Sequence, residues 1–318
     1  MKIAMLEPLA VSAECLEREA EIFKKAGHEV FLTLKPLLDS QKLEAAKDAD
    51  VLIIANSPLP AGLLESSPKV KMISVAFTGV DHLPAAEVKA RGITVSNSQG
   101  YATIPVAELV FGAAITLLRN VIPCDAAARA GKTKDGLVGT ELYGKRLGII
   151  GFGAIGRSVA KIGQAFGCET VAFDVSLEGE AGSLVEGTKI LELDDILATS
   201  DIISLHVPLT PQTRGLIGKE KLGLIKKTAV LINMARGPVV DSQALADALN
   251  NGDIAGAALD VFDVEPPLPL SEPLLGAKNT VLTPHIGFAS KESMVRRAGI
   301  AFGNISAWLA GEPRNVSI

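Results

Sequence analysis

Short apolar runs alternate with stretches of helical spacing along the whole chain. The early strand-like runs are 2–6, 29–34, 51–55, 71–76 and 93–96. A second series follows at 146–150, 170–174, 201–205, 228–233, 255–260 and 280–283. Runs of this kind predict strands, and strands that alternate with helices favour parallel sheets covered on both faces. The pattern therefore predicts an α/β protein with two doubly wound units.

Two longer stretches have the apolar spacing of helices rather than strands. One runs from about residue 104 to 130, and the other, over 290–310, carries the only tryptophan, Trp308. We expect each to form a helix. The alternation does not decide whether the final helix completes the second unit or crosses back to the first.

A glycine-rich turn separates the run 146–150 from the helical stretch 157–166. Gly151 permits a tight turn, Gly153 allows a close approach of the backbone to a pyrophosphate, and Gly156 allows the helix to pack on the strand. Asp174 ends the next strand, eighteen residues beyond Gly156, where an acceptor for a ribose 2′-hydroxyl is expected. A packing turn with no ligand is the alternative. The strand, glycines, helix and acid together predict a dinucleotide site.

Three polar residues come just after strand ends of the second series: Arg236, Glu265 and His285. Hydride transfer to a carbonyl needs a proton donor, a group that orients this donor and a cation for the charge of the substrate. Histidine, glutamate and arginine supply these functions in turn. Taken singly, each has an ordinary structural explanation as a surface ion pair, a solvated acid or a hydrogen-bonded histidine.

Composition narrows the classes of partner. The net charge is −5 with both signs interspersed, which argues against nucleic acid and membrane surfaces as partners. The first residues do not resemble a signal peptide, and Cys15, Cys124 and Cys168 have neither the spacing of a metal site nor that of a disulfide framework. We therefore expect a cytoplasmic protein without a bound metal.

These residues resemble the D-isomer-specific 2-hydroxyacid dehydrogenases, in the short form of the lactate and hydroxypyruvate type, over essentially the whole chain. The resembling stretches are Thr78–His82, Val106–Glu108, Gly151–Arg157, His206–Thr210, Asn233–Gly237 with Val240–Asp241, Leu259–Pro266 and Asn279–His285. The resemblance implies a flavodoxin-like substrate domain formed by residues 1–100 and 288–318. A Rossmann cofactor domain of residues 101–287 is inserted in it. The resemblance also implies a homodimer formed through the cofactor domain.

The resemblance also implies roles for single residues. Arg236, Glu265 and His285 would be the catalytic triad, with Thr78 and Gly79 binding the substrate carboxylate beside Arg236 and Tyr101 bordering the substrate. The residues expected at the cofactor are Gly151, Gly153, Ala154, Ile155, Gly156, Asp174, Val207, Pro208, Thr213, Met234, Asp260, His285 and Gly287. A packing role remains open for Tyr101. We interpret His206 as structural, and His28 and His82 as ordinary surface or turn residues.

Departures from the family pattern bear on the substrate. Asn56 stands where members that use phosphoglycerate carry an arginine, Thr78 where phosphite-oxidising relatives carry lysine, and Glu265 where formate dehydrogenases carry glutamine. We therefore expect NAD-dependent interconversion of a small, unphosphorylated 2-oxo acid and its D-2-hydroxy acid. The alternative is a binding protein that senses NAD(H) on the same fold, like the corepressors of this family. Asp174 predicts a preference for NADH over NADPH.

Overall fold

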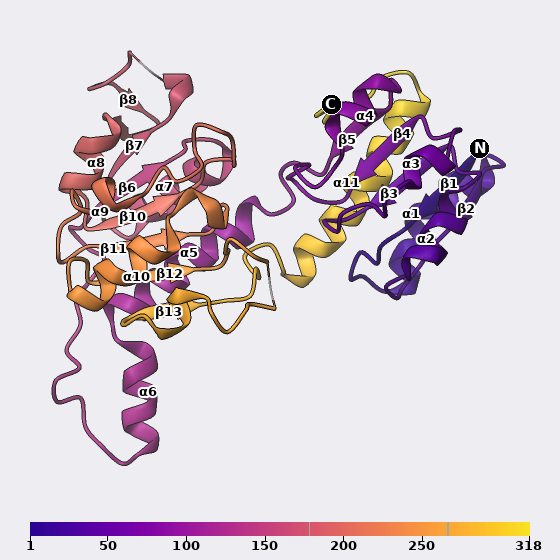
Figure 1. The fold of residues 1–318 in the computed structure, drawn as a ribbon. Coiled ribbons are helices and arrows are strands. Elements are labelled where there is room, and N and C mark those ends of the chain that lie inside the picture. The colour runs from indigo at the N-terminus through magenta and orange to yellow at the C-terminus, as the bar shows by residue number, and fades with distance from the viewer. Residues whose placement is uncertain (178, 266) are drawn as a thin grey trace. The chain divides into compact units, whose positions relative to one another are not determined.

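The computed structural model describes residues 1–177, 179–265 and 267–318. Glu178, one of the acids that follow Asp174 in the sequence, and Pro266, which follows Glu265, lie outside the described residues. The chain divides into two compact units. Unit 1 comprises Met1–Ala102 and Ala289–Ile318, and unit 2 comprises Thr103–Phe288. The two units are described separately below (Figure 1).

Unit 1 contains a parallel sheet in the order β2-β1-β3-β4-β5. Its strands are β1 (Lys2–Met5), β2 (Glu29–Phe31), β3 (Val51–Ile54), β4 (Met72–Val75) and β5 (Thr94–Asn97). This order is the flavodoxin-like one, with its switch point between β1 and β3. The second strand ends at Phe31, earlier than its apolar run, because Thr33 Oγ1 donates to Lys35 O at 2.6 Å and closes a local turn.

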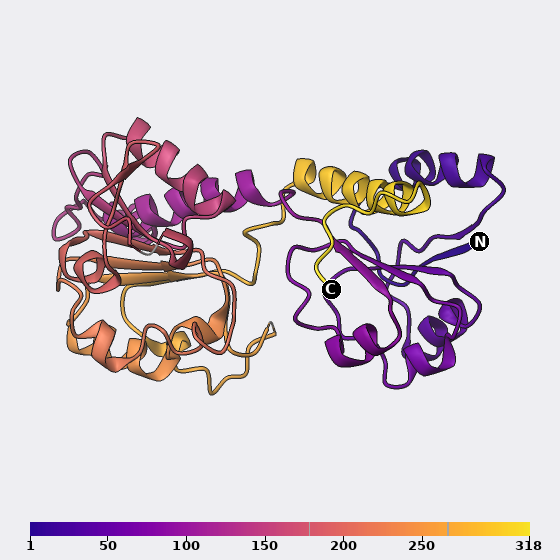
Figure 2. The same cartoon turned by 90° about the horizontal axis from the view of Figure 1, so that it is seen from above.

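Helices cover both faces of this sheet (Figure 2). They are α1 (Ala13–Lys25), α2 (Asp39–Ala46), α3 (Leu63–Ser66), α4 (Ala85–Ala90) and α11 (Lys291–Leu309). The final helix therefore belongs to unit 1, where it packs on α1 and β4. It begins at Ser290, whose side chain accepts a hydrogen bond from Ser293 N. Phe302 of this helix packs into a core with Ile3, Met5, Phe23 and Ile53.

Unit 2 contains a larger sheet in the order β13-β12-β11-β10-β6-β7-β9-β8. Its strands are β6 (Arg146–Ile150), β7 (Glu169–Phe173), β8 (Leu184–Val185), β9 (Thr188–Ile190), β10 (Ile202–Leu205), β11 (Val230–Asn233), β12 (Gly256–Leu259) and β13 (Thr280–Leu282). All pairs are parallel except β8 with β9. The short pair β8 and β9 was not expected from the sequence, because two or three residues show no clear apolar pattern. The predicted α/β class with doubly wound parallel sheets is confirmed.

Helices also cover both faces of the sheet of unit 2 (Figure 2). The helices of this unit are α5 (Thr103–Leu118), α6 (Val121–Arg129), α7 (Ala154–Ala165), α8 (Leu193–Thr199), α9 (Lys219–Leu222) and α10 (Ser242–Asn251), with 3₁₀ turns at Val175–Leu177, Gly237–Val239 and Pro273–Gly276. Of these, α6 extends away from the sheet (Figure 1). On one face α5 packs against α7. On the other, α8 and α10 each contact α9.

The predicted single helix over 104–130 is wrong, because the chain breaks into α5 and α6. Asn120 adopts φ of 52°, a left-handed conformation that asparagine tolerates better than most residues. The two helices meet at 58°. Among the described residues no single helix has the length and apolar character of a membrane span, although this bent pair together meets that criterion.

Candidate active site

The glycine-rich turn follows β6 at the switch point of the unit 2 sheet, between β6 and β10. Gly151 has φ of 97°, and a Cβ there would lie 2.6 Å from the carbonyl carbon of His206, which follows β10. A Cβ at Gly156 would lie 2.1 Å from Gly151 O. These contacts explain why two of the three positions admit only glycine.

The middle glycine differs from the other two. A Cβ built at Gly153 would meet nothing within 4 Å, so this atom would project into open space at the start of α7. Gly153 is the N-cap of α7 and offers no side-chain cap to the amides of the first turn, where Ala154 and Ile155 lie. An uncapped helix N-terminus with an open approach fits a pyrophosphate.

Asp174 immediately follows β7, the strand beside β6. Its carboxylate accepts hydrogen bonds from Phe152 N at 2.7 Å, from Ser176 N at 2.9 Å and from Ser176 Oγ at 2.7 Å. Burial raises the pKa of this carboxyl, but these hydrogen bonds and the charge of Arg157 outweigh burial and lower the pKa below its usual value. Asp174 is therefore an anion at neutral pH, tied to the glycine-rich turn.

His285 and Glu265 meet at the carboxyl ends of β13 and β12, which are neighbouring strands. His285 Nδ1 lies 2.7 Å from Glu265 Oε2. The histidine side chain is 17% exposed and the glutamate side chain 52%. The pair thus joins a largely enclosed imidazole to a carboxylate that reaches solvent.

The backbone around His285 is held by Asp260, which is 1% exposed. His285 itself has φ of 56° and donates its backbone N–H to Asp260 O at 2.8 Å. The Asp260 carboxylate accepts from Ile286 N at 2.8 Å, Gly287 N at 2.7 Å and Thr283 Oγ1 at 2.6 Å. These four hydrogen bonds to Asp260 hold His285 in its left-handed backbone conformation. This function of Asp260 was not evident from the sequence.

Arg236 follows β11, the strand on the other side of β12. Its guanidinium donates from Nη1 to Ala235 O at 2.8 Å, and Asn233 Nδ2 donates to Arg236 O at 2.9 Å. A Cβ at Gly237 would lie 1.9 Å from Phe262 C, so the turn after Arg236 packs tightly on the segment after β12. The three residues of the expected triad therefore arise from the carboxyl ends of three adjacent strands.

The remaining cofactor residues expected from the resemblance also lie in unit 2. Met234 and Gly287 are buried, Val207 and Thr213 are half-buried, and Pro208 is exposed. Thr213 Oγ1 donates to Pro208 O at 2.6 Å and accepts from Thr210 N at 2.8 Å, which closes the loop after β10. His206 Nε2 lies 2.8 Å from Ser204 Oγ. Burial of the imidazole lowers the pKa of His206 to about 4, although part of the residue reaches the surface.

Thr78, Gly79 and Tyr101 belong to unit 1. Thr78 is exposed in the loop after β4, where Asn97 Nδ2 donates to Thr78 O at 2.8 Å. Tyr101 is 1% exposed, with its ring 6.1 Å from that of Phe77 and 5.9 Å from the guanidinium carbon of Arg297. This burial favours the packing interpretation of Tyr101, and its contact with substrate stays a prediction.

Comparisons with known proteins bear on this geometry. The family model for the NAD binding domain of D-isomer specific 2-hydroxyacid dehydrogenases matches residues 111–287. A glyoxylate reductase of Thermofilum pendens is 40% identical over 276 residues, which cover 85% of this chain and 81% of that protein. The chain belongs to the D-isomer specific 2-hydroxyacid dehydrogenase family. It is an NAD-dependent oxidoreductase, as the sequence predicted.

Other relatives of this dehydrogenase agree. A glycerate dehydrogenase of Methylorubrum extorquens is 40% identical over 283 residues, which cover 86% of this chain and 87% of that protein. The structure of an acyclic imino acid reductase in complex with NADPH and D-Arg is similar at a TM-score of 0.88 and 28% identity, over all of both chains. The predicted family is confirmed, and the match to the NAD binding domain model confirms NAD as the cofactor. The roles of single residues stay predictions.

Proposed function

We propose that this dehydrogenase reduces a small, unphosphorylated 2-oxo acid to the D-2-hydroxy acid with NADH. The observation that carries the proposal is the 2.7 Å contact between His285 Nδ1 and Glu265 Oε2 at the carboxyl edge of the sheet. Similarity to proteins named glyoxylate reductase and glycerate dehydrogenase supports the size of the substrate. Asn56, an exposed neutral side chain, supports the absence of a phosphate.

NADH, when bound, supplies the hydride. The residues that would hold it are the amides of Ala154 and Ile155 for the pyrophosphate and Asp174 for the adenosine ribose. Val207, Pro208 and Thr213 would line the adenine side. Met234 and Asp260 would hold the carboxamide, with His285 to Gly287 over the ring. Because the two Asp260 oxygens already accept three hydrogen bonds, we expect only the remaining lone-pair capacity of Oδ2 to serve the cofactor.

His285 is the proton donor in this proposal. Its Nδ1 faces Glu265, so its Nε2 is the atom that gives a proton to the developing alkoxide oxygen of the substrate. Glu265 fixes the tautomer and compensates the charge of the imidazolium. Arg236 binds the substrate carboxylate with two parallel hydrogen bonds and thereby orients the carbonyl.

A panel of 2-oxo acids tests this function. The purified enzyme should oxidise NADH with glyoxylate, hydroxypyruvate or pyruvate, and His285→Ala should lower kcat by ~10²- to 10⁴-fold while NADH binding is retained. His28→Ala is the matched control, since His28 is half-buried in unit 1 just before β2, outside the expected site, and its loss should leave kcat unchanged. Tight NADH binding without turnover on any member of the panel would favour the NAD(H)-sensing alternative. Near-normal turnover by His285→Ala would remove His285 from the mechanism.

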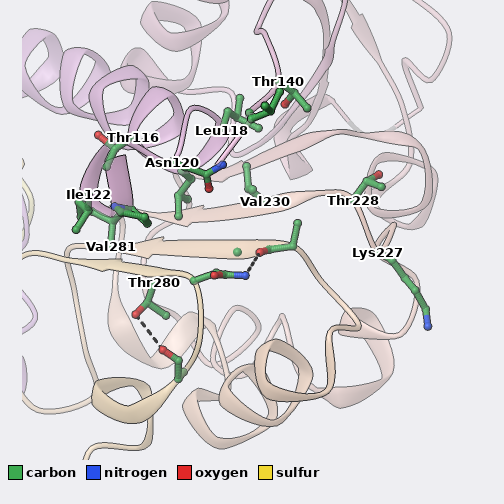
Figure 3. A pocket seen from close by; sticks show the side chains of 18 residues that line it. Thr116, Leu118, Asn120, Ile122, Thr140, Lys227, Thr228, Val230, Thr280 and Val281 are labelled. Carbon is green, nitrogen blue, oxygen red and sulfur yellow. Dashed lines mark hydrogen bonds between the residues drawn. The ribbon is translucent and has the colours of Figure 1, made fainter. Parts of the chain in front are cut away.

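We further propose a homodimer formed through unit 2, in the cytoplasm. The support for a second copy is α6, none of whose residues is buried and which extends away from the sheet of unit 2 (Figure 1). Ile122 and Val138 are 55% and 80% exposed. They line a hollow of about 560 Å³ between the end of α5, the start of α6 and the first residues of β11 to β13 (Figure 3). A projecting helix with exposed apolar side chains beside a hollow on the same chain suits a self-complementary, two-fold interface.

Light scattering after size exclusion tests the dimer. The wild-type chain should run at twice its 33.1 kDa mass, and the double variant Ile122→Asp with Val138→Asp should run as a monomer. Leu184→Asp is the control, because Leu184 is 72% exposed on β8 at the opposite end of the sheet order. A monomeric wild type, or a double variant that stays dimeric, would overturn this assignment.

The proposed location in the cytoplasm is supported by the cysteines. Cys15, Cys124 and Cys168 are free thiols, as expected in a reducing compartment.

A further inference from the structure

An ion pair links α7, the helix after the glycine-rich turn, to the hairpin of β8 and β9 at one edge of the unit 2 sheet (Figure 1). Arg157 Nη1 donates to Glu186 Oε1 at 2.9 Å. The arginine side chain is 36% exposed and the glutamate side chain 63%. An ion pair at this exposure contributes little to stability, because water screens the charges and both side chains lose rotamer freedom. Its consequence is instead that the guanidinium of Arg157 already has an anionic partner.

The backbone at Glu186 is also unusual. Glu186 and Gly187 are the two residues of the turn between β8 and β9, with φ of 51° and 78°. Two left-handed residues in a hairpin turn of this length favour asparagine followed by glycine. A glutamate in the left-handed region is strained, so the turn itself gains nothing from this side chain. What the glutamate contributes is its carboxylate.

The hairpin turn is fixed along one face of α7. Gln164 Nε2 donates to Glu186 O at 3.0 Å, and Arg157 binds the carboxylate of the same residue. Arg157 and Gln164 are separated by about two helical turns, so they lie on the same face of the helix. Gln164 thus holds the backbone of the turn near the end of α7, and the Glu186 side chain reaches from there toward the start of the helix.

Arg157 also lies beside the anion expected at the adenosine ribose. Its guanidinium carbon is 4.7 Å from the centre of the Phe152 ring, and Phe152 N donates to Asp174 Oδ2 at 2.7 Å. The charge of Arg157 contributes to the lowered pKa of Asp174. A 2′-phosphate on that ribose would therefore come close to Arg157. A guanidinium binds phosphate with two parallel hydrogen bonds when its donors are available.

We propose that Glu186 is a specificity-determining residue that favours NADH over NADPH by holding Arg157 in this ion pair. The inference rests on the part of the proposed function that places Asp174 at the adenosine ribose. Glu186 occupies a donor of Arg157 and balances its charge, so a 2′-phosphate finds less attraction there. The 2′-hydroxyl of NADH is neutral and is bound by Asp174, so the affinity for NADH does not depend on a free Arg157.

The test measures the Kd of NADPH and of NADH by isothermal titration calorimetry, with no 2-oxo acid present. Glu186→Gln removes the charge at nearly constant shape. It should lower the Kd of NADPH by ~5-fold and change the Kd of NADH by less than ~2-fold. The ratio of kcat/KM for the two cofactors should shift by the same factor.

Glu169→Gln is the matched control, because it breaks an ion pair of the same kind elsewhere in the sheet. Arg146 Nε and Nη2 donate to Glu169 Oε2 and Oε1 at 3.0 and 2.9 Å. Arg146 and Glu169 begin β6 and β7, so they lie at the opposite ends of these strands from Gly151 and Asp174. This control should change neither Kd.

Two further variants separate the release of Arg157 from other effects. In an Arg157→Gln background, Glu186→Gln should change the Kd of NADPH by less than ~2-fold, because the cation that would bind the phosphate is absent. Glu186→Asn places a residue that suits the left-handed turn, so it should fold and give the same gain as Glu186→Gln. A distorted turn therefore does not account for a gain that both variants share.

An unchanged Kd of NADPH in both Glu186 variants, or a gain of full size in the absence of Arg157, would overturn the role of Glu186 and leave the reductase function intact. Equal Kd values of the wild type for the two cofactors would overturn it as well, together with the placement of Asp174. A wild type that binds NADH but reduces no 2-oxo acid would instead overturn the proposed reaction, and the binding results would still decide the role of Glu186.

Discussion

Replacement of Asp174 should relax the choice between NADH and NADPH. The Asp174 carboxylate has a lowered pKa and is held by Phe152 N and Ser176, so it is a fixed anion beside the glycine-rich turn. Arg157, the neighbouring cation, is already engaged, because its Nη1 donates to Glu186 Oε1 at 2.9 Å and its guanidinium lies 4.7 Å from the Phe152 ring centre. A 2′-phosphate would therefore meet the carboxylate beside a cation that is already paired with Glu186.

The size of the effect follows from two terms. A 2′-phosphate carries about −1.5 to −2 charges, and at ~5 Å from a carboxylate with an effective dielectric constant of ~40 the repulsion is about 2.5–3.3 kcal/mol. Loss of the hydrogen bond between a ribose hydroxyl and the charged carboxylate adds roughly 1.5–3 kcal/mol. Salt screening and movement of the phosphate reduce this sum. A net value of ~3 kcal/mol corresponds to a preference for NADH of ~10²-fold in kcat/KM.

The assay is the ratio of kcat/KM for the two cofactors at saturating 2-oxo acid. Asp174→Asn should lower the ratio by ~10-fold, since it removes the charge and keeps one acceptor oxygen. Asp174→Ser combined with Val175→Arg should bring the ratio close to one or reverse it. Asp253→Asn is the control, because Asp253 is a half-exposed acid before β12, four strands away from β7 in the sheet order, and should leave the ratio unchanged. A wild type with equal rates for the two cofactors, or an Asp174→Asn ratio equal to that of the wild type, would refute the placement of Asp174 at the ribose.

Three further predictions concern the triad and His206. Glu265→Gln should lower kcat by ~10- to 10²-fold with little change in NADH affinity, because the amide cannot balance the charge of an imidazolium. Steady-state rates equal to those of the wild type would contradict this prediction. Arg236→Lys should raise KM for the 2-oxo acid far more than the Kd of NADH, since a point charge cannot make two parallel hydrogen bonds; an equal loss of both would indicate a cofactor or structural role. The pKa of His206 is about 4 in the folded protein and ~6.5 in the unfolded chain, so the unfolded chain binds a proton first as the pH falls. The free energy of unfolding is therefore unaffected by this residue above pH ~6.5 and decreases by up to about 3 kcal/mol as the pH falls toward 4. Urea unfolding followed by circular dichroism should therefore show a shallower pH dependence for His206→Gln than for the wild type, and identical slopes would count against the burial of this imidazole.

The sequence by itself determined the class of fold and most of the strands. Parallel strands buried on both faces are continuous apolar runs, and those of β6, β10 and β11 stand out without any tertiary information. The glycine-rich turn and Asp174 were also evident, because a tight backbone approach and a ribose acceptor need specific residues at nearly fixed spacing. The residues of the triad could be proposed because each follows a strand end.

Tertiary structure decided the features that depend on partners distant in sequence. The pair β8 and β9 exists because it completes the edge beside β7, not because its few residues have a strong pattern. The end of α5 depends on Asn120, one left-handed residue within an otherwise helical pattern. The attachment of α11 to unit 1 follows from its packing on α1 and β4, which no local signal encodes.

The same distinction holds within the sites. The family resemblance implied Asp260 as a cofactor residue, but only the fold brings its carboxylate to the amides of Ile286 and Gly287, more than twenty residues away. Glu7 is an acid that follows the first strand, and its hydrogen bonds come from amides 48 and 50 residues further along the chain. A carboxylate acquires its role from the donors that enclose it. Those donors are backbone groups present at almost every residue, so only the folded chain specifies which of them meet the carboxylate.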